Sequence, residues 1–222
     1  FSIIKYTSPG STDDQSFPHG LNKKPSFIIV KNLDRGYSWD VYHQSLGYNA
    51  ALILQLTNAT RTGVFSAEPT SSVVNTKTSY THYLTDKYVA YCWHDVPGLQ
   101  KFGSFEGNGN ADGPFVELGF KPAVIITKNI DNYGTNYDWC IYDNTRSTFN
   151  PNDKFLCPNL SNVENVRGDG STDNARYVDF LSNGFKIRNN SSPMNLNAHT
   201  IIYAAWAEAP TFNLYGAQSN AR

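Results

Sequence analysis

The stretch that decides the fold is residues 25–43, PSFIIVKNLDRGYSWDVYH, because a version of it returns at residues 122–143 as PAVIITKNIDNYGTNYDWCIYD. In each copy an apolar run is followed by a turn rich in Gly, Asn and Asp, and then by a run that carries Trp and Tyr. This pattern is typical of a β-hairpin. The sequence therefore predicts a duplicated hairpin, in which Pro25, Lys31, Trp39 and Tyr42 correspond to Pro122, Lys128, Trp139 and Tyr142.

A second pair of segments closes each half of the chain. Residues 87–97, KYVAYCWHDVP, correspond to residues 200–210, TIIYAAWAEAP, which brings Trp93 onto Trp206. Strands this apolar on both faces are expected in the middle of a sheet. We therefore expect two tandem, internally duplicated antiparallel β-sandwich lobes of jelly-roll-like type, packed together, over residues 1–98 and 99–209. Residues 210–222 form a C-terminal tail that we expect to dock on a neighbouring subunit, with a frayed end as the alternative.

The composition also indicates an all-β protein. Aromatic residues make up 14% of the 222 residues and charged residues only 17%, with a single Met, so the residues that favour helices are scarce. A net charge of −1 offers no basic field for nucleic acid. No apolar run is long enough for a transmembrane helix, so no membrane insertion is expected. The chain starts at Phe1 rather than Met, and we expect further sequence upstream.

The three cysteines predict no complete set of disulfides. Cys92 and Cys140 lie in predicted strands, where a thiol behaves as a small buried hydrophobe, while a disulfide or a metal site is the alternative. No CxxC or HExxH spacing occurs, and the calcium-like half-loop at residues 169–173 lacks the bidentate Glu of a hand motif. We therefore expect no metal and no cofactor.

The carboxylates predict no catalytic pair. A glycosidase needs two acids across one cleft. Asp95 and Glu208 stand at equivalent positions of the repeat, and such a pair belongs to two separate lobes. We expect no catalytic residue and no enzymatic activity, with a glycoside hydrolase as the alternative.

Exposed tyrosines are the remaining candidates for ligand binding. Tyr37, Tyr133 and Tyr137 lie in the turns 36–38 and 132–137, among Asn, Ser and Gly, which is the composition of adaptable recognition surfaces and of sugar-stacking sites. We expect these turns and the longer loop 151–178 at the outer face of the protein. Ordinary surface or subunit contact is the alternative role for these tyrosines.

The order of several segments resembles a known family. These segments include YTSPGS (6–11), FPHGLNKKPSFIIVKN (17–32), WDVYHQSL (39–46), GSFEGNGNADGPFVELGFKPAVIITK (103–128), WCIYDNTRSTFNP (139–151) and TIIYAAWAEAP (200–210). Together they resemble a duplicated module of virion proteins from marine tailed phages, including cyanophages, often in tail-fibre or other tail-associated chains. The resemblance covers nearly the whole chain, and it carries no catalytic residue.

What the resemblance implies is a non-enzymatic virion component in the tail or at the particle surface, extracellular once assembled. Its expected partners are itself as a homo-oligomer, with a trimer favoured, other virion proteins, and host-surface glycan. Two alternatives stay open at this point. One is a capsid decoration protein without a ligand, and the other is a glycan depolymerase of a phage tail.

Overall fold

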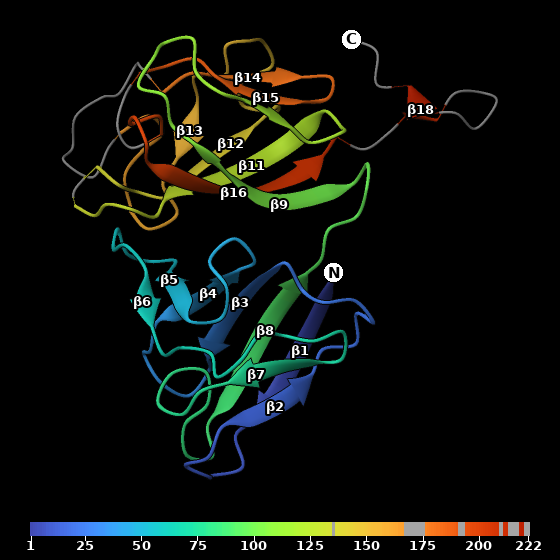
Figure 1. The fold of residues 1–222 in the computed structure, drawn as a ribbon, viewed down its shortest axis with the longest axis vertical. Coiled ribbons are helices and arrows are strands. Elements are labelled where there is room, and N and C mark those ends of the chain that lie inside the picture. Colours follow the sequence, from blue (N-terminus) through green and yellow to red (C-terminus); the bar gives the residue numbers. More distant parts are fainter. Residues whose placement is uncertain (135, 167–175, 191–193, 209–210, 213–217, 220–222) are drawn as a thin grey trace. The chain divides into compact units, whose positions relative to one another are not determined.

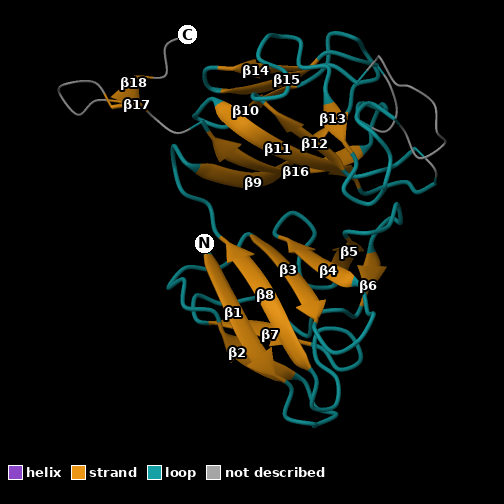
Figure 2. Ribbon diagram, turned by 180° about the vertical axis from the view of Figure 1, so that it is seen from behind, coloured by secondary structure: helices purple, strands orange, loops and turns teal. Residues whose placement is uncertain are grey.

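The structure is a computed structural model that describes residues 1–222 apart from 135, 167–175, 191–193, 209–210, 213–217 and 220–222 (Figure 1). No helix occurs among the described residues, and all paired strands run antiparallel (Figure 2). The expected all-β, antiparallel sandwich class is confirmed. The chain divides into two compact units, Phe1–Asp95 (unit 1) and Val96–Arg222 (unit 2).

Unit 1 contains eight strands in two sheets. The larger sheet has the order β1-β8-β3-β4-β5-β6, and β2 pairs with β7 in the smaller one. The strands are β1 (Ser2–Thr7), β2 (Gln15–Pro18), β3 (Phe27–Asn32), β4 (Trp39–His43), β5 (Ala50–Ile53), β6 (Arg61–Thr62), β7 (Val73–Thr76) and β8 (Lys87–Trp93).

Unit 2 repeats this arrangement. Its larger sheet has the order β13-β12-β11-β16-β9, and its second sheet has the order β10-β15-β14. The strands are β9 (Gln100–Glu106), β10 (Phe115–Glu117), β11 (Pro122–Asn129), β12 (Cys140–Asp143), β13 (Phe155–Leu156), β14 (Val178–Leu181), β15 (Gly184–Ile187) and β16 (Thr200–Ala207). A further pair, β17 (Thr211–Phe212) and β18 (Gln218–Ser219), lies near the end of the chain.

The two larger sheets share one strand order, because β1-β8-β3-β4-β5 of unit 1 matches β9-β16-β11-β12-β13 of unit 2. The predicted hairpins are β3–β4 and β11–β12, and their registers agree: Ile28 lies opposite Tyr42, and Ile125 lies opposite Tyr142. The predicted closing strands are β8 and β16, and each lies in the interior of its sheet. The duplication seen in the sequence is therefore a duplication of sheet topology.

Aromatic rings fill the space between the two sheets of unit 1. Phe17 of β2 stacks on Tyr6 of β1 with 4.0 Å between ring centroids, and Phe65 meets Tyr42 edge-on at 5.8 Å. In β8, alternate residues face this core, as the period of a strand requires. Burial of these rings supplies most of the apolar contact between the sheets.

The core of unit 2 is built on the same plan. Phe185 of β15 meets Tyr203 of β16 edge-on, with 5.5 Å between ring centroids, and it meets Phe105 of β9 at 5.9 Å. Tyr142 of β12 and Phe155 of β13 are fully buried in the same cluster. The second sheet of unit 2 is thus held on the larger one by contacts from its central strand.

Two sequence expectations concern residues at or beyond the edge of the described chain. The tail 210–222 is described only at β17 and β18, so its docking on a neighbour stays a prediction. The calcium-like half-loop at 169–173 lies outside the described residues. Among the residues that are described, no helix is long and apolar enough to cross a membrane.

Candidate functional site

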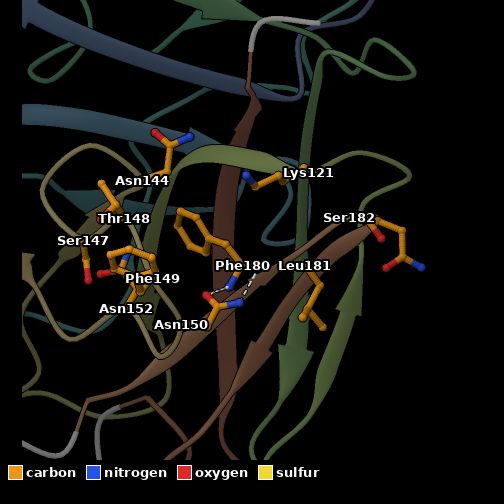
Figure 3. Close-up of a pocket in the computed structure, with 11 residues that line it drawn as sticks. Lys121, Asn144, Ser147, Thr148, Phe149, Asn150, Asn152, Phe180, Leu181 and Ser182 are labelled. Carbon is orange, nitrogen blue, oxygen red and sulfur yellow. Dashed lines mark hydrogen bonds between the residues drawn. The ribbon is translucent and has the colours of Figure 1, made fainter. Parts of the chain in front are cut away.

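The larger of two pockets among the described residues lies in unit 2 and has a volume of about 640 Å³. Three segments form it: the residue that precedes β11, the loop that follows β12, and the end of β14 with its turn to β15 (Figure 3). The lining residues are Lys121, Asn144, Ser147, Thr148, Phe149, Asn150, Asn152, Phe180, Leu181, Ser182 and Asn183.

Asn150 fixes the position of the loop after β12. Its side-chain amide donates to the carbonyl of Phe180 over 2.9 Å, and its side-chain oxygen accepts from the backbone N–H of Phe180 over 2.9 Å (Figure 3). Asn152 continues this pairing, because its backbone exchanges hydrogen bonds with Val178 at 2.7 and 3.1 Å. The loop is therefore held along β14 by bonds that imitate a strand pair.

The lining combines one exposed ring with amides and hydroxyls. Phe149 has 83% of its surface exposed, while Asn144, Thr148, Ser182 and Asn183 bring polar side chains to the same pocket. The ammonium of Lys121 lies 2.8 Å from a carboxylate oxygen of Glu208. None of the described residues that line the pocket is Asp or Glu. Such a surface can stack a ring and hydrogen-bond hydroxyl groups.

A smaller pocket of about 250 Å³ lies in unit 1. Tyr37 and Tyr80, each more than a third exposed, line it together with Gly36, Ser38, Ser79 and the ion pair between Asp40 and Arg61. The guanidinium of Arg61 lies over the ring of Tyr80, 4.5 Å from its centroid. Two phenol rings therefore stand beside a fixed donor and a fixed acceptor.

The ion pair in this small pocket has a buried acid. Burial raises the pKa of Asp40 to about 6, and the charge and hydrogen bond of Arg61 limit that rise. Asp40 is only 3% exposed. Near neutral pH its carboxylate is ionised and held toward Arg61, which keeps the pocket's hydrogen-bonding groups in place.

The three sequence-predicted tyrosines are not brought together. Tyr37 lines the small pocket of unit 1. Tyr133 of unit 2 is 71% exposed, and its neighbour Tyr137 is partly buried, its hydroxyl accepting a hydrogen bond from Asn132 over 3.0 Å. Neither of these two belongs to the lining of the larger pocket.

Sequence reasoning missed Phe149 and the loop that carries it. A single Phe within the polar run NTRSTFNPND, with no counterpart in the first copy, was the available signal. A large ring in a polar run has few apolar neighbours in sequence to form a core with, so it indicates a contact surface.

The buried histidines have hydrogen-bonding partners and are not grouped with acids in a metal-binding or catalytic site among the described residues. His19, His43 and His82 are fully buried, and His19 and His82 meet Thr70 and Thr76 at 3.1 and 3.0 Å. Within the described part of the chain, no three His, Cys, Asp or Glu side chains are grouped so that they could hold a metal ion.

Comparisons with known proteins give one match. Neither the curated proteins nor the solved structures include a match to this chain. A family model does match, over residues 1–210, and so covers both units almost completely. The chain therefore belongs to the family described as "Domain of unknown function (DUF7483)".

Proposed function

We propose that this chain is a non-enzymatic carbohydrate-binding module of a virion, in the tail or at the particle surface, where it contacts host-surface glycan. The carbohydrate part of this proposal is carried by one observation, the polar pocket of unit 2 with the exposed ring of Phe149 at its edge. The virion part is supported by the resemblance of the ordered segments to tail-associated phage proteins.

The chemistry of the pocket suits a neutral sugar. Sugars present hydroxyl groups for hydrogen bonds and a face of C–H groups that stacks on an aromatic ring. Asn144, Thr148, Ser182 and Asn183 supply donors and acceptors of both kinds, and Phe149 supplies the ring. The small pocket of unit 1 offers a second contact of the same class through Tyr37 and Tyr80.

Weak single sites make several copies necessary. Shallow sugar sites commonly bind near the millimolar range, about −4 kcal/mol, and linked copies multiply the effect through a high effective concentration. We therefore include a homo-oligomer in the proposal, with a trimer favoured because cyclic symmetry closes the assembly. Other virion proteins are its further partners.

A hydrolytic role fits the pocket less well. Glycoside hydrolysis uses two carboxyl groups, about 5–10 Å apart across the bond that is cleaved. Among the described residues, the lining of the larger pocket includes neither Asp nor Glu. In the small pocket Asp40 is the sole lining acid, and it is paired with Arg61.

The proposal is tested by screening the full chain against an array of neutral, amino and acidic oligosaccharides and titrating the strongest binder by calorimetry. Phe149→Ala is expected to weaken binding about tenfold, which corresponds to about 1.4 kcal/mol. Tyr133→Ala is the matched control, because Tyr133 is also a highly exposed ring of unit 2 (71% against 83% for Phe149) and is not part of the pocket lining.

Three results would contradict the proposal. If no oligosaccharide binds, the chain is a structural protein without a glycan ligand. If Tyr133→Ala weakens binding and Phe149→Ala does not, the turn 132–137 is the binding surface. If the chain releases reducing sugar from the bound oligosaccharide at substoichiometric amounts, it is a depolymerase.

A further inference from the structure

Two of the three cysteines face each other across neighbouring strands of unit 2. In the register of β12 and β13, Tyr142 lies opposite Phe155 and Ile141 lies opposite Leu156. One more step in this register places Cys140, the first residue of β12, opposite Cys157, which directly follows β13. Directly opposed residues share one face of a sheet, and their Cβ atoms lie about 4.5–5.5 Å apart. Both thiols belong to the same buried core, with exposures of 1% and 7%.

This separation suits a disulfide. A disulfide requires Cα atoms about 4.4–6.8 Å apart and side chains directed toward each other, which opposed residues on one face of an antiparallel pair can satisfy. Both cysteines are free thiols in the structure.

A buried arginine lies against the first thiol. Arg176 is 1% exposed, and its guanidinium donates to Sγ of Cys140 over 3.0 Å and to the carbonyl of Asn136 over 3.2 Å. The same guanidinium lies 5.0 Å from the ring centroid of Phe155 on β13. A cation directed at one of two adjacent sulfurs makes the thiols unequal, because it favours the thiolate at Cys140.

The pKa values follow this asymmetry. The adjacent thiol of Cys157 and the charge of Arg176 lower the pKa of Cys140 below its usual value, although burial opposes the change. The adjacent thiol of Cys140 and burial raise the pKa of Cys157. Cys140 is therefore the thiol that reaches its nucleophilic form first.

We propose that Cys140 and Cys157 are an oxidation site that joins β12 to β13 by a disulfide, with a low-molecular-weight disulfide such as oxidised glutathione as the oxidant. The thiolate of Cys140 attacks one sulfur of oxidised glutathione and releases the first glutathione thiolate. Cys157, after losing its proton, attacks Sγ of Cys140 in the mixed disulfide and releases the second. The two cysteines are oxidised by two electrons, and one oxidised glutathione is reduced to two reduced molecules.

Access to the buried pair comes from the position of β13. This strand contains two residues and forms the outer edge of the five-stranded sheet, so it has a hydrogen-bonded partner in that sheet on one side only. Short edge elements open at a lower free energy than the rest of a sheet. Local detachment of β13 exposes both thiols together, and its return brings Cys157 onto the mixed disulfide.

Unit 1 cannot form the corresponding bond. There, Asp40 follows the Trp of the hairpin, as Cys140 does in unit 2, and it lies opposite Ile53. The third cysteine, Cys92 of β8, lies opposite Ser2 and Ile28, so no thiol faces it across either neighbouring strand. Cys92 is consequently a matched control, buried in the same way and without a partner thiol.

The experiment uses the full reduced chain, equilibrated with oxidised and reduced glutathione at several ratios, then quenched, denatured and alkylated. Reduced protein carries three alkylated cysteines. The oxidised form is expected to carry one, on Cys92, with a peptide that links Cys140 to Cys157 and an intact mass lower by two hydrogen atoms. The bond closes the loop of residues 141–156, so oxidation should raise the melting temperature of unit 2 by roughly 5–10 °C, reversibly on adding dithiothreitol.

Variants separate the pair from its surroundings. Cys92→Ala should form the linked peptide as readily as the parent, whereas Cys140→Ser and Cys157→Ser should each abolish both the link and the thermal shift. The proposal is overturned if all three cysteines of the native parent are still alkylated at every glutathione ratio. It is equally overturned if the linked peptide contains Cys92. Both outcomes are read on the parent chain, so they do not depend on the folding of a variant.

Discussion

The two units share a strand order but differ in the side-chain contacts that connect the loops at one end of the hairpin. In unit 1, Glu68 accepts hydrogen bonds from the hydroxyl of Tyr42 at 2.7 Å and the backbone of Tyr48 at 2.8 Å, and it forms an ion pair with Lys24 at 2.7 Å. Lys24 lies before β3, Tyr48 after β4 and Glu68 before β7, while Tyr42 belongs to β4 itself. In unit 2 the corresponding three segments line the larger pocket.

The lysines show how the difference arises. Lys24 and Lys121 both stand immediately before the proline that begins the hairpin, but Lys121 pairs with Glu208 at the end of β16 instead of with an acid between the loops. In unit 1 the side chain of Glu68 therefore holds three segments together. In unit 2 no acid joins the corresponding described segments, and they line the larger pocket. The same sheet topology therefore has three segments joined by Glu68 in unit 1 and a candidate binding pocket at the corresponding place in unit 2.

The largest expected effect separates the two hairpin tryptophans. Trp139 is 1% exposed and Trp39 is 36% exposed, although both stand at the same position of the repeat. Trp139→Ala should lower the free energy of unfolding by about 3–5 kcal/mol, because it leaves a cavity in the core, and Trp39→Ala should cost less than about 1 kcal/mol. Urea unfolding followed by circular dichroism measures both. Equal losses would mean that the two hairpins pack alike.

The second prediction concerns pH and the buried acid of unit 1. Because burial raises the pKa of Asp40 to about 6, the folded state holds this proton more tightly than the unfolded state does. The resulting stability is fully present below the ordinary pKa of Asp, near 4, and is lost as pH rises through 6, in total about 3 kcal/mol.

Other carboxylates titrate in the same pH range, so the effect of Asp40 is measured by comparing the free energy of unfolding of the parent with that of Asp40→Asn. The free energy of unfolding of the parent minus that of Asp40→Asn should fall between pH 4 and pH 7. A flat difference would show that Asp40 titrates alike in the folded and unfolded states. Unit 2 has Cys140 at this position and should not respond to the substitution.

The third prediction concerns Glu68, whose side chain joins three segments of unit 1. Glu68→Ala removes three partners at once and leaves the buried hydroxyl of Tyr42 without its acceptor, which should cost about 1–2 kcal/mol. Glu68→Gln keeps an acceptor and should cost less. Burial would raise the pKa of Glu68, but Lys24, Tyr42 and Tyr48 lower it overall, so its contribution is present at neutral pH and lost as pH falls through the lowered value.

Thermal melts of the parent and the two variants at neutral pH check this order. If Glu68→Gln is as unstable as Glu68→Ala, the charge matters more than the hydrogen bonds. If neither variant melts earlier than the parent, the junction contributes nothing to the stability of unit 1.

The smallest expected effect tests whether unit 1 also binds sugar. Tyr37→Ala should weaken binding of the best oligosaccharide by about twofold to fivefold, less than Phe149→Ala, because its pocket is the smaller one. Calorimetry with the double variant Phe149→Ala/Tyr37→Ala distinguishes two independent sites from one. A double variant no weaker than Phe149→Ala alone would assign binding to unit 2.

Repetition made the scaffold predictable. Agreement between two copies identified the hairpins, and the apolar composition of residues 87–97 and 200–210 placed the closing strands inside the sheets. The repetition did not predict that Trp39 would be exposed and Trp139 buried. That difference depends on which loops cover each hairpin, and the loops are where the copies diverge.

The sites were harder to predict because they depend on contacts across long separations. The pocket at Phe149 requires Asn150 to pair with Phe180, thirty residues away. The pairing of Cys140 with Cys157 requires the register of β13, a strand of two residues that no periodic pattern could reveal. The exposed tyrosines were identifiable by composition, which does not say which of them share a pocket.

The strand order also determines when each unit can fold. In both larger sheets the strand synthesised last lies between two strands that are synthesised early. β8 pairs with β1 on one side and β3 on the other, and β16 does the same with β9 and β11. The two early strands of each sheet are therefore connected only through the last one. On the ribosome the two early strands must wait until nearly the whole unit has emerged, and such long-range pairing is slow. Since β8 and β16 close equivalent gaps, we expect their different sequences, KYVAYCW and TIIYAAWA, to keep each strand with its own unit during synthesis.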